Sequence, residues 1–126
     1  MKTVVILIVL IATGVVYAKN EHARRWRQHY EECAQMFDVE VDVRIDLILC
    51  AAIKDGGYLY TNGAYSPETL LRRIPMFVSD PVKLQQAYQI FYKCNNEATQ
   101  SGEDGLWKSI QFLLCGKSMI TLIDAE

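Results

Sequence analysis

The sequence predicts an all-α protein, a compact bundle of about five to six short helices. Apolar side chains recur at steps of three and four residues in one segment after another, which is the spacing of one helix face. Helix start and stop signals separate these segments, and no convincing sheet emerges. The 126 residues carry a net charge of −2 and are 51% hydrophobic, which fits one small folded domain and excludes a disordered chain.

Residues 1–18 are expected to be a secretory signal peptide. Lys2 precedes an apolar or small stretch that ends in the small-residue exit Val16-Tyr17-Ala18. The stretch is shorter than the roughly twenty apolar residues that span a bilayer, because charged residues begin at Lys19. We therefore expect residues 19–126 to form a soluble, exported helical domain without stable membrane insertion.

The first predicted helix runs from about Glu21 to Phe37. Trp26, Tyr30, Cys33 and Phe37 form its apolar stripe, and charged residues occupy its other faces. Those charged faces are expected to be solvated.

A second helix is predicted over roughly Val39–Lys54, although its β-branched residues also permit a strand. Gly56 and Gly57 end it, since glycine readily adopts the left-handed geometry of a helix end. Residues 58–60, which lie between turn signals, are either a short hairpin arm or an ordered loop. The apolar stripe of this helix comprises Val41, Ile45, Ile48, Leu49 and Ala52.

Two further helices have clear start signals. Ser66-Pro67-Glu68 combines a capping side chain, a proline at the first helical position and an acid in the first turn, and Asp80-Pro81 repeats the signal. Pro75 is expected to end the first of these helices, and Asn95-Asn96 to end the second soon afterwards. The second helix carries on one face Leu84, Ala87, Tyr88, Phe91 and Cys94.

The last strong helix follows a polar loop at residues 100–105 and ends at Cys115-Gly116. The tail after it is apolar and is expected to pack on the body of the domain. The apolar positions of the helix and the tail are Leu106, Trp107, Ile110, Leu113, Leu114, Met119, Ile120, Leu122 and Ile123.

Catalysis is the weakest functional hypothesis. His22 and His29 lie seven residues apart in a charged stretch and are expected to face solvent, and no recognised catalytic or phosphate-binding motif is present. The acidic residues between 38 and 46 lack the glycine turn of a calcium loop. The near-neutral net charge does not supply the excess of positive charge that binding to the phosphates of a nucleic acid needs. We therefore expect no enzyme activity, no cofactor and no metal.

The four cysteines are Cys33, Cys50, Cys94 and Cys115. An even number in an exported domain of this size suggests two disulfides. The absence of any CxxC pair argues against a zinc site. Cross-links of this kind also allow a small helical domain to keep an internal cavity, but residue spacing does not separate core from cavity wall.

The cysteine pattern and its context resemble the insect odorant-binding proteins, the pheromone/general odorant-binding family. The first cysteine ends an amphipathic helix, and Cys50 precedes a glycine- and tyrosine-bearing turn and a Ser-Pro helix start. Gaps of 43 and 20 residues then lead to Cys94 and Cys115. The two missing family cysteines would fall at Asp46 and Leu106, as in the four-cysteine minus-C subgroup.

The resemblance implies the disulfides Cys33–Cys50 and Cys94–Cys115. The interval between Cys33 and Cys50 is shorter than the family's, which leaves open whether a separate helix lies between them. Asp46 would then lie on a core-facing turn and need a partner or access to water.

The resemblance also implies a secreted, extracellular carrier of small hydrophobic ligands such as odorants, pheromones or lipid-like molecules. Its partners would be the ligand and a membrane chemoreceptor, and it would be a monomer or weak homodimer. Tyr88 and Trp107 are expected to supply hydrogen bonds, and Ile120 and Ile123 to form a lid. The residues expected to line the cavity are Leu70, Ile74, Met76, Phe77, Leu84, Tyr88, Phe91, Trp107, Ile110, Leu114, Ile120 and Ile123.

Two alternatives remain open. One is a protein resembling the salivary amine- or lipid-mediator-sequestering proteins of blood-feeding insects. An amine site should place a carboxylate inside the pocket, so an inward-facing Asp46 would favour it. A secreted interaction module, such as an inhibitor or toxin, would have a filled core and a large exposed apolar patch.

Overall fold

The computed structural model describes residues 20–125, and the predicted signal peptide lies outside them. This part of the chain forms five α-helices and one 3-10 helix and has no strand beyond an isolated bridge between Leu59 and Tyr65. The all-α prediction is confirmed. No helix within the described range has the length and apolar content to cross a membrane. The elements are α2 (Glu21–Phe37), α3 (Ile45–Asp55), α4 (Pro67–Phe77), α5 (Pro81–Gln100), α6 (Gly105–Gly116) and η1 (Lys117–Leu122).

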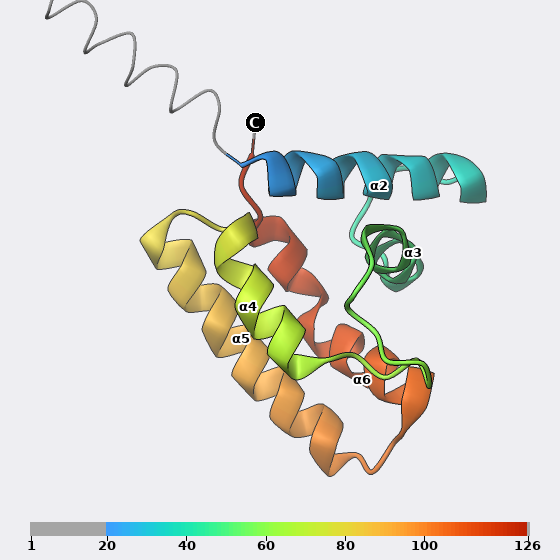
Figure 1. The fold of residues 1–126 in the computed structure, drawn as a ribbon, viewed down its shortest axis with the longest axis vertical. Coiled ribbons are helices and arrows are strands. Elements are labelled where there is room, and N and C mark those ends of the chain that lie inside the picture. The colour runs from blue at the N-terminus through green and yellow to red at the C-terminus, as the bar shows by residue number, and fades with distance from the viewer. Residues whose placement is uncertain (1–19, 126) are drawn as a thin grey trace, which may run out of the picture.

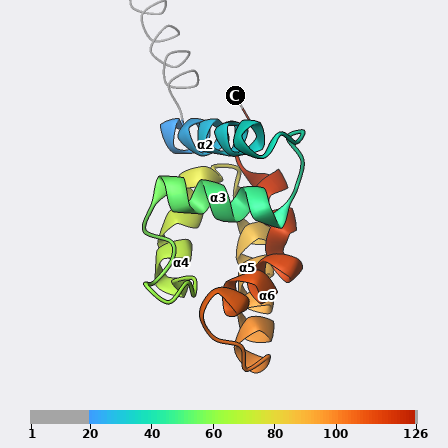
Figure 2. The ribbon, with the colours of Figure 1, turned by 90° about the vertical axis from the view of Figure 1, so that its right-hand side faces the viewer.

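The helices are arranged in two packed groups. α2 packs chiefly on α3, and α5 packs chiefly on α6 and α4. Figure 1 shows α2 lying across one end of the antiparallel pair α4 and α5, with the C-terminal tail returning to the start of α2. Figure 2 shows α3 alongside α2 at that same end.

The first helix has the predicted limits, but the second begins six residues later than predicted. α2 ends at Phe37 and is capped by Asp38, which adopts a left-handed conformation with φ of 56°. The Tyr30 hydroxyl donates to the Asp42 carbonyl and accepts from the Arg44 amide at 3.1 Å, so it fixes the extended connection before α3. Phe37, predicted to be part of the buried stripe, is exposed, and it is the last residue of the α2 end that extends beyond α3 in Figure 1.

Two predicted helix ends are wrong. α4 continues through Pro75 to Phe77, because the ring of proline holds a helical φ and removes only one backbone hydrogen bond. α5 continues past Asn95 to Gln100, because the side chain of Asn95 accepts a hydrogen bond from Tyr65 at 2.6 Å and Ala98 beyond it is fully buried.

The two helix starts at Asp80 and Asp104 provide a matched test of capping. The Asp80 carboxylate accepts from the Lys83 amide at 2.9 Å, whereas Asp104 precedes α6 without a side-chain cap. We expect Asp80→Ala to lower the free energy of unfolding by about 1 kcal/mol. Asp104→Ala should cost clearly less in the same urea titration. Equal losses would show that the Asp80 cap adds nothing beyond its charge near the helix start.

The core consists of two buried clusters, and each contains one end of a disulfide. Cys33–Cys50 joins α2 to α3 directly, with no separate helix between them, and Cys94–Cys115 joins α5 to α6. Both predicted pairings are confirmed. Cys33 lies in the α2–α3 cluster and Cys94 in the cluster around α5, so each half of the core has its own cross-link.

Candidate functional site

An apolar cavity of about 130 Å³ lies between the two halves of the core. Its wall takes residues from both buried clusters, and every helix contributes at least one side chain. The cavity is therefore a product of how the two halves meet. Its apolar lining is Trp26, Ile48, Leu49, Ala52, Tyr58, Leu59, Tyr65, Leu70, Ile74, Phe77, Val78, Ala87, Phe112, Leu113, Met119, Ile120 and Ile123.

The C-terminal tail forms part of this wall. Ile120 and Ile123 line the cavity, and Asp124 directly after them is held by contacts to other elements. Its carboxylate accepts from the Asn20 side chain at 2.6 Å and from the Ser79 amide at 2.9 Å. The prediction that the apolar tail packs on the body is thus correct, since these contacts join it to the start of α2 and to the α4–α5 connection.

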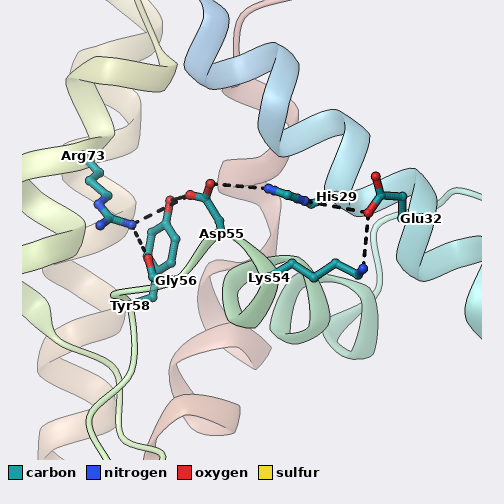
Figure 3. Close-up of polar contacts among 7 residues, drawn as sticks. All are labelled: His29, Glu32, Lys54, Asp55, Gly56, Tyr58 and Arg73. Carbon is teal, nitrogen blue, oxygen red and sulfur yellow. Dashed lines mark hydrogen bonds and ion pairs between the residues drawn. The ribbon is translucent and has the colours of Figure 1, made fainter.

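A cluster of polar side chains lies at the start of the α3–α4 loop (Figure 3), and two of its members, Tyr58 and Arg73, line the cavity. Arg73 donates to the Gly56 carbonyl at 2.6 Å, and its guanidinium lies 4.5 Å from the centre of the Tyr58 ring. The Tyr58 hydroxyl donates to Asp55 at 2.8 Å, and Asp55 also lies 3.8 Å from the Arg73 guanidinium. Arg73 thus contributes its stem to an apolar wall while its charge stays paired.

The same group continues onto α2 (Figure 3). His29 lies between Asp55, at 3.7 Å, and Glu32, at 3.9 Å, and Lys54 donates to Glu32 at 3.2 Å. His29, which was predicted to face solvent, is therefore half-buried between α2 and α3, while His22 is exposed as predicted.

Burial of the phenols that line the cavity raises their pKa. Tyr65 donates to Asn95, and burial raises the pKa of Tyr65 to about 12. Burial is also the largest cause of the raised pKa of Tyr58, with the adjacent Asp55 acting in the same direction and Arg73 opposing it. Both phenols are thus held in their neutral form, as an apolar wall requires.

This burial predicts a loss of stability at alkaline pH. The neutral phenols stabilise the fold fully below pH 10, the ordinary tyrosine value, and the stabilisation is lost as pH rises toward about 12. We expect Tyr65→Phe to lower stability at pH 8, because the bond to Asn95 is lost, and to flatten the decline between pH 10 and 12. Urea unfolding across this range measures both effects.

The exposed Tyr92 supplies the control, since Tyr92→Phe should leave the decline unchanged. If the stability of Tyr65→Phe declined between pH 10 and 12 as steeply as that of the wild type, burial of Tyr65 would not be a cause of the alkaline destabilisation.

The structure places five of the predicted ligand-lining residues in the cavity wall: Leu70, Ile74, Phe77, Ile120 and Ile123. Phe91 is fully buried core, and Leu84, Tyr88 and Ile110 are half-buried outside the wall. Met76, Trp107 and Leu114 are exposed, Trp107 by 65%, because these positions of α4 and α6 point away from the bundle. The hydrogen-bonding roles predicted for Tyr88 and Trp107 therefore do not belong to this cavity.

Several wall residues were assigned by the sequence only to helix cores or loops. Trp26 belongs to the α2 stripe, and Tyr58 and Tyr65 come from the α3–α4 loop. Helical periodicity marks a residue as buried, but both a core and a cavity wall bury it. The one sequence feature that could have pointed to Tyr58 as a wall residue is the position of a large aromatic side chain in a loop bounded by glycines.

Asp46 does not face the core. Its carboxylate is exposed and pairs with Arg44 at 2.9 and 3.0 Å, and these hydrogen bonds lower the pKa of Asp46. Leu106, the other position of the missing cysteine pair, is also exposed.

A sequence profile of the ant venom allergen Sol i 2 family matches residues 32–120, which is 89 of the 126 residues. The chain belongs to this family. The Sol i 2 family is an insect odorant-binding-protein-like family, so the resemblance noted in the sequence holds at that level. No curated protein and no solved structure matches the chain significantly.

In this member of the Sol i 2 family, the match runs from α2 to η1 and includes all four disulfide-bonded cysteines. It therefore covers both halves of the core and most of the cavity wall. Assignment to the minus-C subgroup stays a prediction.

Proposed function

We propose that the chain is a secreted, non-catalytic carrier that holds a small hydrophobic molecule in the cavity between the two core halves. The observation that supports this proposal is an apolar cavity of about 130 Å³ in a bundle cross-linked on both sides. Membership in an odorant-binding-protein-like family supports it further. Export agrees with the two disulfides and with the predicted signal peptide.

The size of the cavity limits the ligand. An apolar cavity of about 150 Å³ takes a molecule of the size of benzene, so this cavity, of about 130 Å³, fits a small ring or a short branched chain of about that size. Binding would be driven by apolar surface leaving water, at about 25 cal/mol per Å². Odorants and pheromones of this size are candidates, whereas a long lipid needs the cavity to expand.

The alternatives fit the structure less well. An inward-facing Asp46 would have favoured the amine-sequestering hypothesis, but Asp46 is exposed and paired with Arg44. The interaction-module hypothesis required a filled core, and the cavity is not filled. An interaction with a membrane chemoreceptor and a monomeric or weakly dimeric state remain proposals.

A cavity-filling variant tests the carrier. Ala87 and Ala98 are both fully buried on α5, but only Ala87 lines the cavity. With toluene at ten times its Kd, we expect the mature wild-type protein to gain about 1.4 kcal/mol of stability. Ala87→Leu should fold with little loss of stability and abolish this gain, because three added carbons occupy the cavity.

Ala98→Leu is the control. It should cost about 1–3 kcal/mol through overpacking and keep the toluene-induced gain. Absence of any gain in the wild type with toluene and with other ring-sized apolar compounds would refute the carrier proposal.

A further inference from the structure

The indole nitrogen of Trp26 is a buried hydrogen-bond donor without an acceptor in the part of the chain that the structure describes. Trp26 is 6% exposed and lines the cavity, and its Nε1 has no hydrogen-bond partner within residues 20–125. Leaving a buried N–H unpaired costs free energy comparable to a lost hydrogen bond. Such groups are rare in folded proteins, and each one needs an explanation.

The rings around Trp26 do not supply this partner. Tyr58 and Phe77 pack on the indole edge-to-face, with ring centres 5.9 and 6.0 Å away. An aromatic face is a weak acceptor compared with a carbonyl oxygen. Trp26 thus keeps most of its hydrogen-bonding capacity unused.

Apart from Lys117, which is exposed, the other side-chain donors of the wall are already committed. The three hydroxyl groups that line the cavity each donate their single proton to a protein oxygen at ordinary distance, and Arg73 is paired as described above. The other buried side-chain nitrogen without a partner among the described residues, Nδ1 of His29, is not in the cavity wall. The committed pairs are Tyr58 to Asp55, Tyr65 to Asn95 and Ser109 to the Gly63 carbonyl, at 2.8, 2.6 and 2.7 Å.

We propose that the cavity selects apolar ligands that carry a hydrogen-bond acceptor, such as a ketone, an aldehyde, an ether or an ester, and that Trp26 Nε1 donates to that oxygen. This inference rests on the proposed carrier function and specifies the ligand class. The indole nitrogen is covered by protein atoms, so ligand entry has to turn the indole or shift its neighbours. Trp26, Ile120 and Ile123 line both the cavity and a surface groove next to it.

A pair of isosteric probes tests the proposal. Cyclohexanone and methylenecyclohexane have nearly the same shape and fit a benzene-sized cavity, but only the ketone offers an acceptor. The mature protein, labelled with ¹⁵N, has two indole N–H signals, from Trp26 and from the exposed Trp107. We expect cyclohexanone to move the Trp26 proton downfield and methylenecyclohexane to leave it without this shift, while the Trp107 signal stays in place under both.

Affinity provides the second measurement. The ratio of the two Kd values should change roughly two- to tenfold in favour of the hydrocarbon when Trp26→Phe removes the N–H. Trp107→Phe is the matched control and should leave the ratio unchanged. Using the ratio cancels the different solubilities of the probes in water and any general loss of binding in the variant.

The outcomes separate the two proposals. Suppose that methylenecyclohexane shifts the NMR signals of cavity residues and that cyclohexanone binds without a downfield shift of the Trp26 indole proton. The proposed acceptor preference is then overturned, while the carrier proposal is supported. If neither probe perturbs the cavity residues, the carrier proposal fails and the preference fails with it. Should Trp26→Phe not fold, the indole shifts in the wild-type protein decide the question alone.

Discussion

Replacing Cys94 and Cys115 with alanine is expected to lower the free energy of unfolding by about 3 kcal/mol, within a range of roughly 2–5 kcal/mol. The bridge closes a loop of 21 residues between α5 and α6, and its removal lets the unfolded chain explore many more conformations. Cys94 is fully buried, so alanine leaves a small additional void. Urea unfolding of the mature protein, followed by circular dichroism, measures the loss.

The pair Cys33 and Cys50 provides the comparison. Its loop has 17 residues, so the same model gives a similar loss of about 3 kcal/mol. The two variants should differ in which half loosens, and hydrogen exchange should accelerate in α5 and α6 for the first and in α2 and α3 for the second. A loss below 1 kcal/mol for the Cys94–Cys115 pair would show that packing alone orders that half.

The size of this effect bears on the cavity. An empty cavity of about 130 Å³ costs about 3 kcal/mol at roughly 24 cal/mol per Å³, which is close to what one disulfide contributes. The free energy of unfolding of a small domain without cross-links is only a few times larger than this cost. The expected contribution of each disulfide is therefore large enough to offset the cost of leaving this interface unfilled.

Truncation of Phe91 to alanine is expected to destabilise the fold by about 3–5 kcal/mol. Phe91 is 1% exposed at the centre of the α5 cluster, and its ring centre lies 5.8 Å from that of Phe112. The loss combines the transfer of the ring to water with the new void, and thermal or urea unfolding measures it. Toluene should still stabilise the variant, because Phe91 is not part of the cavity wall.

Tyr92 next to it is 60% exposed and gives the matched control. Tyr92→Ala removes a ring of similar size and should cost well under 1 kcal/mol apart from its edge contact with Phe91. Comparable losses in the two variants would mean that α5 does not pack through this face. A loss of toluene binding in Phe91→Ala at a stability that keeps it folded would return Phe91 to the ligand site.

The secondary structure followed closely from local sequence signals. The limits of α2 and the starts of α4 and α5 agree with the apolar stripe and with the Ser66-Pro67 and Asp80-Pro81 signals, because these features act within one helical turn. The errors arose where distant contacts prevail over local preference. Asn95 does not end α5 because Tyr65, thirty residues away in the chain, bonds its side chain.

The cavity wall was predicted only in part. Ile74 and Phe77 were identified, but Trp107 was assigned to the wall and is exposed, while Trp26 was assigned to the core and lines the wall. Both tryptophans lie on amphipathic helices, and periodicity does not say which neighbouring element each face meets.

The sequence by itself determined that this protein is a small helical domain with two disulfides, and its cysteine spacing resembles that of odorant-binding proteins, because helix formation, capping and cysteine spacing are properties of short segments and of the chain's order. Only the tertiary structure decided that the two cross-linked halves meet around a void, and that an unpaired indole lies in its wall. These features depend on how the faces of all the helices pack together, and the residue spacing within any single helix does not determine that packing.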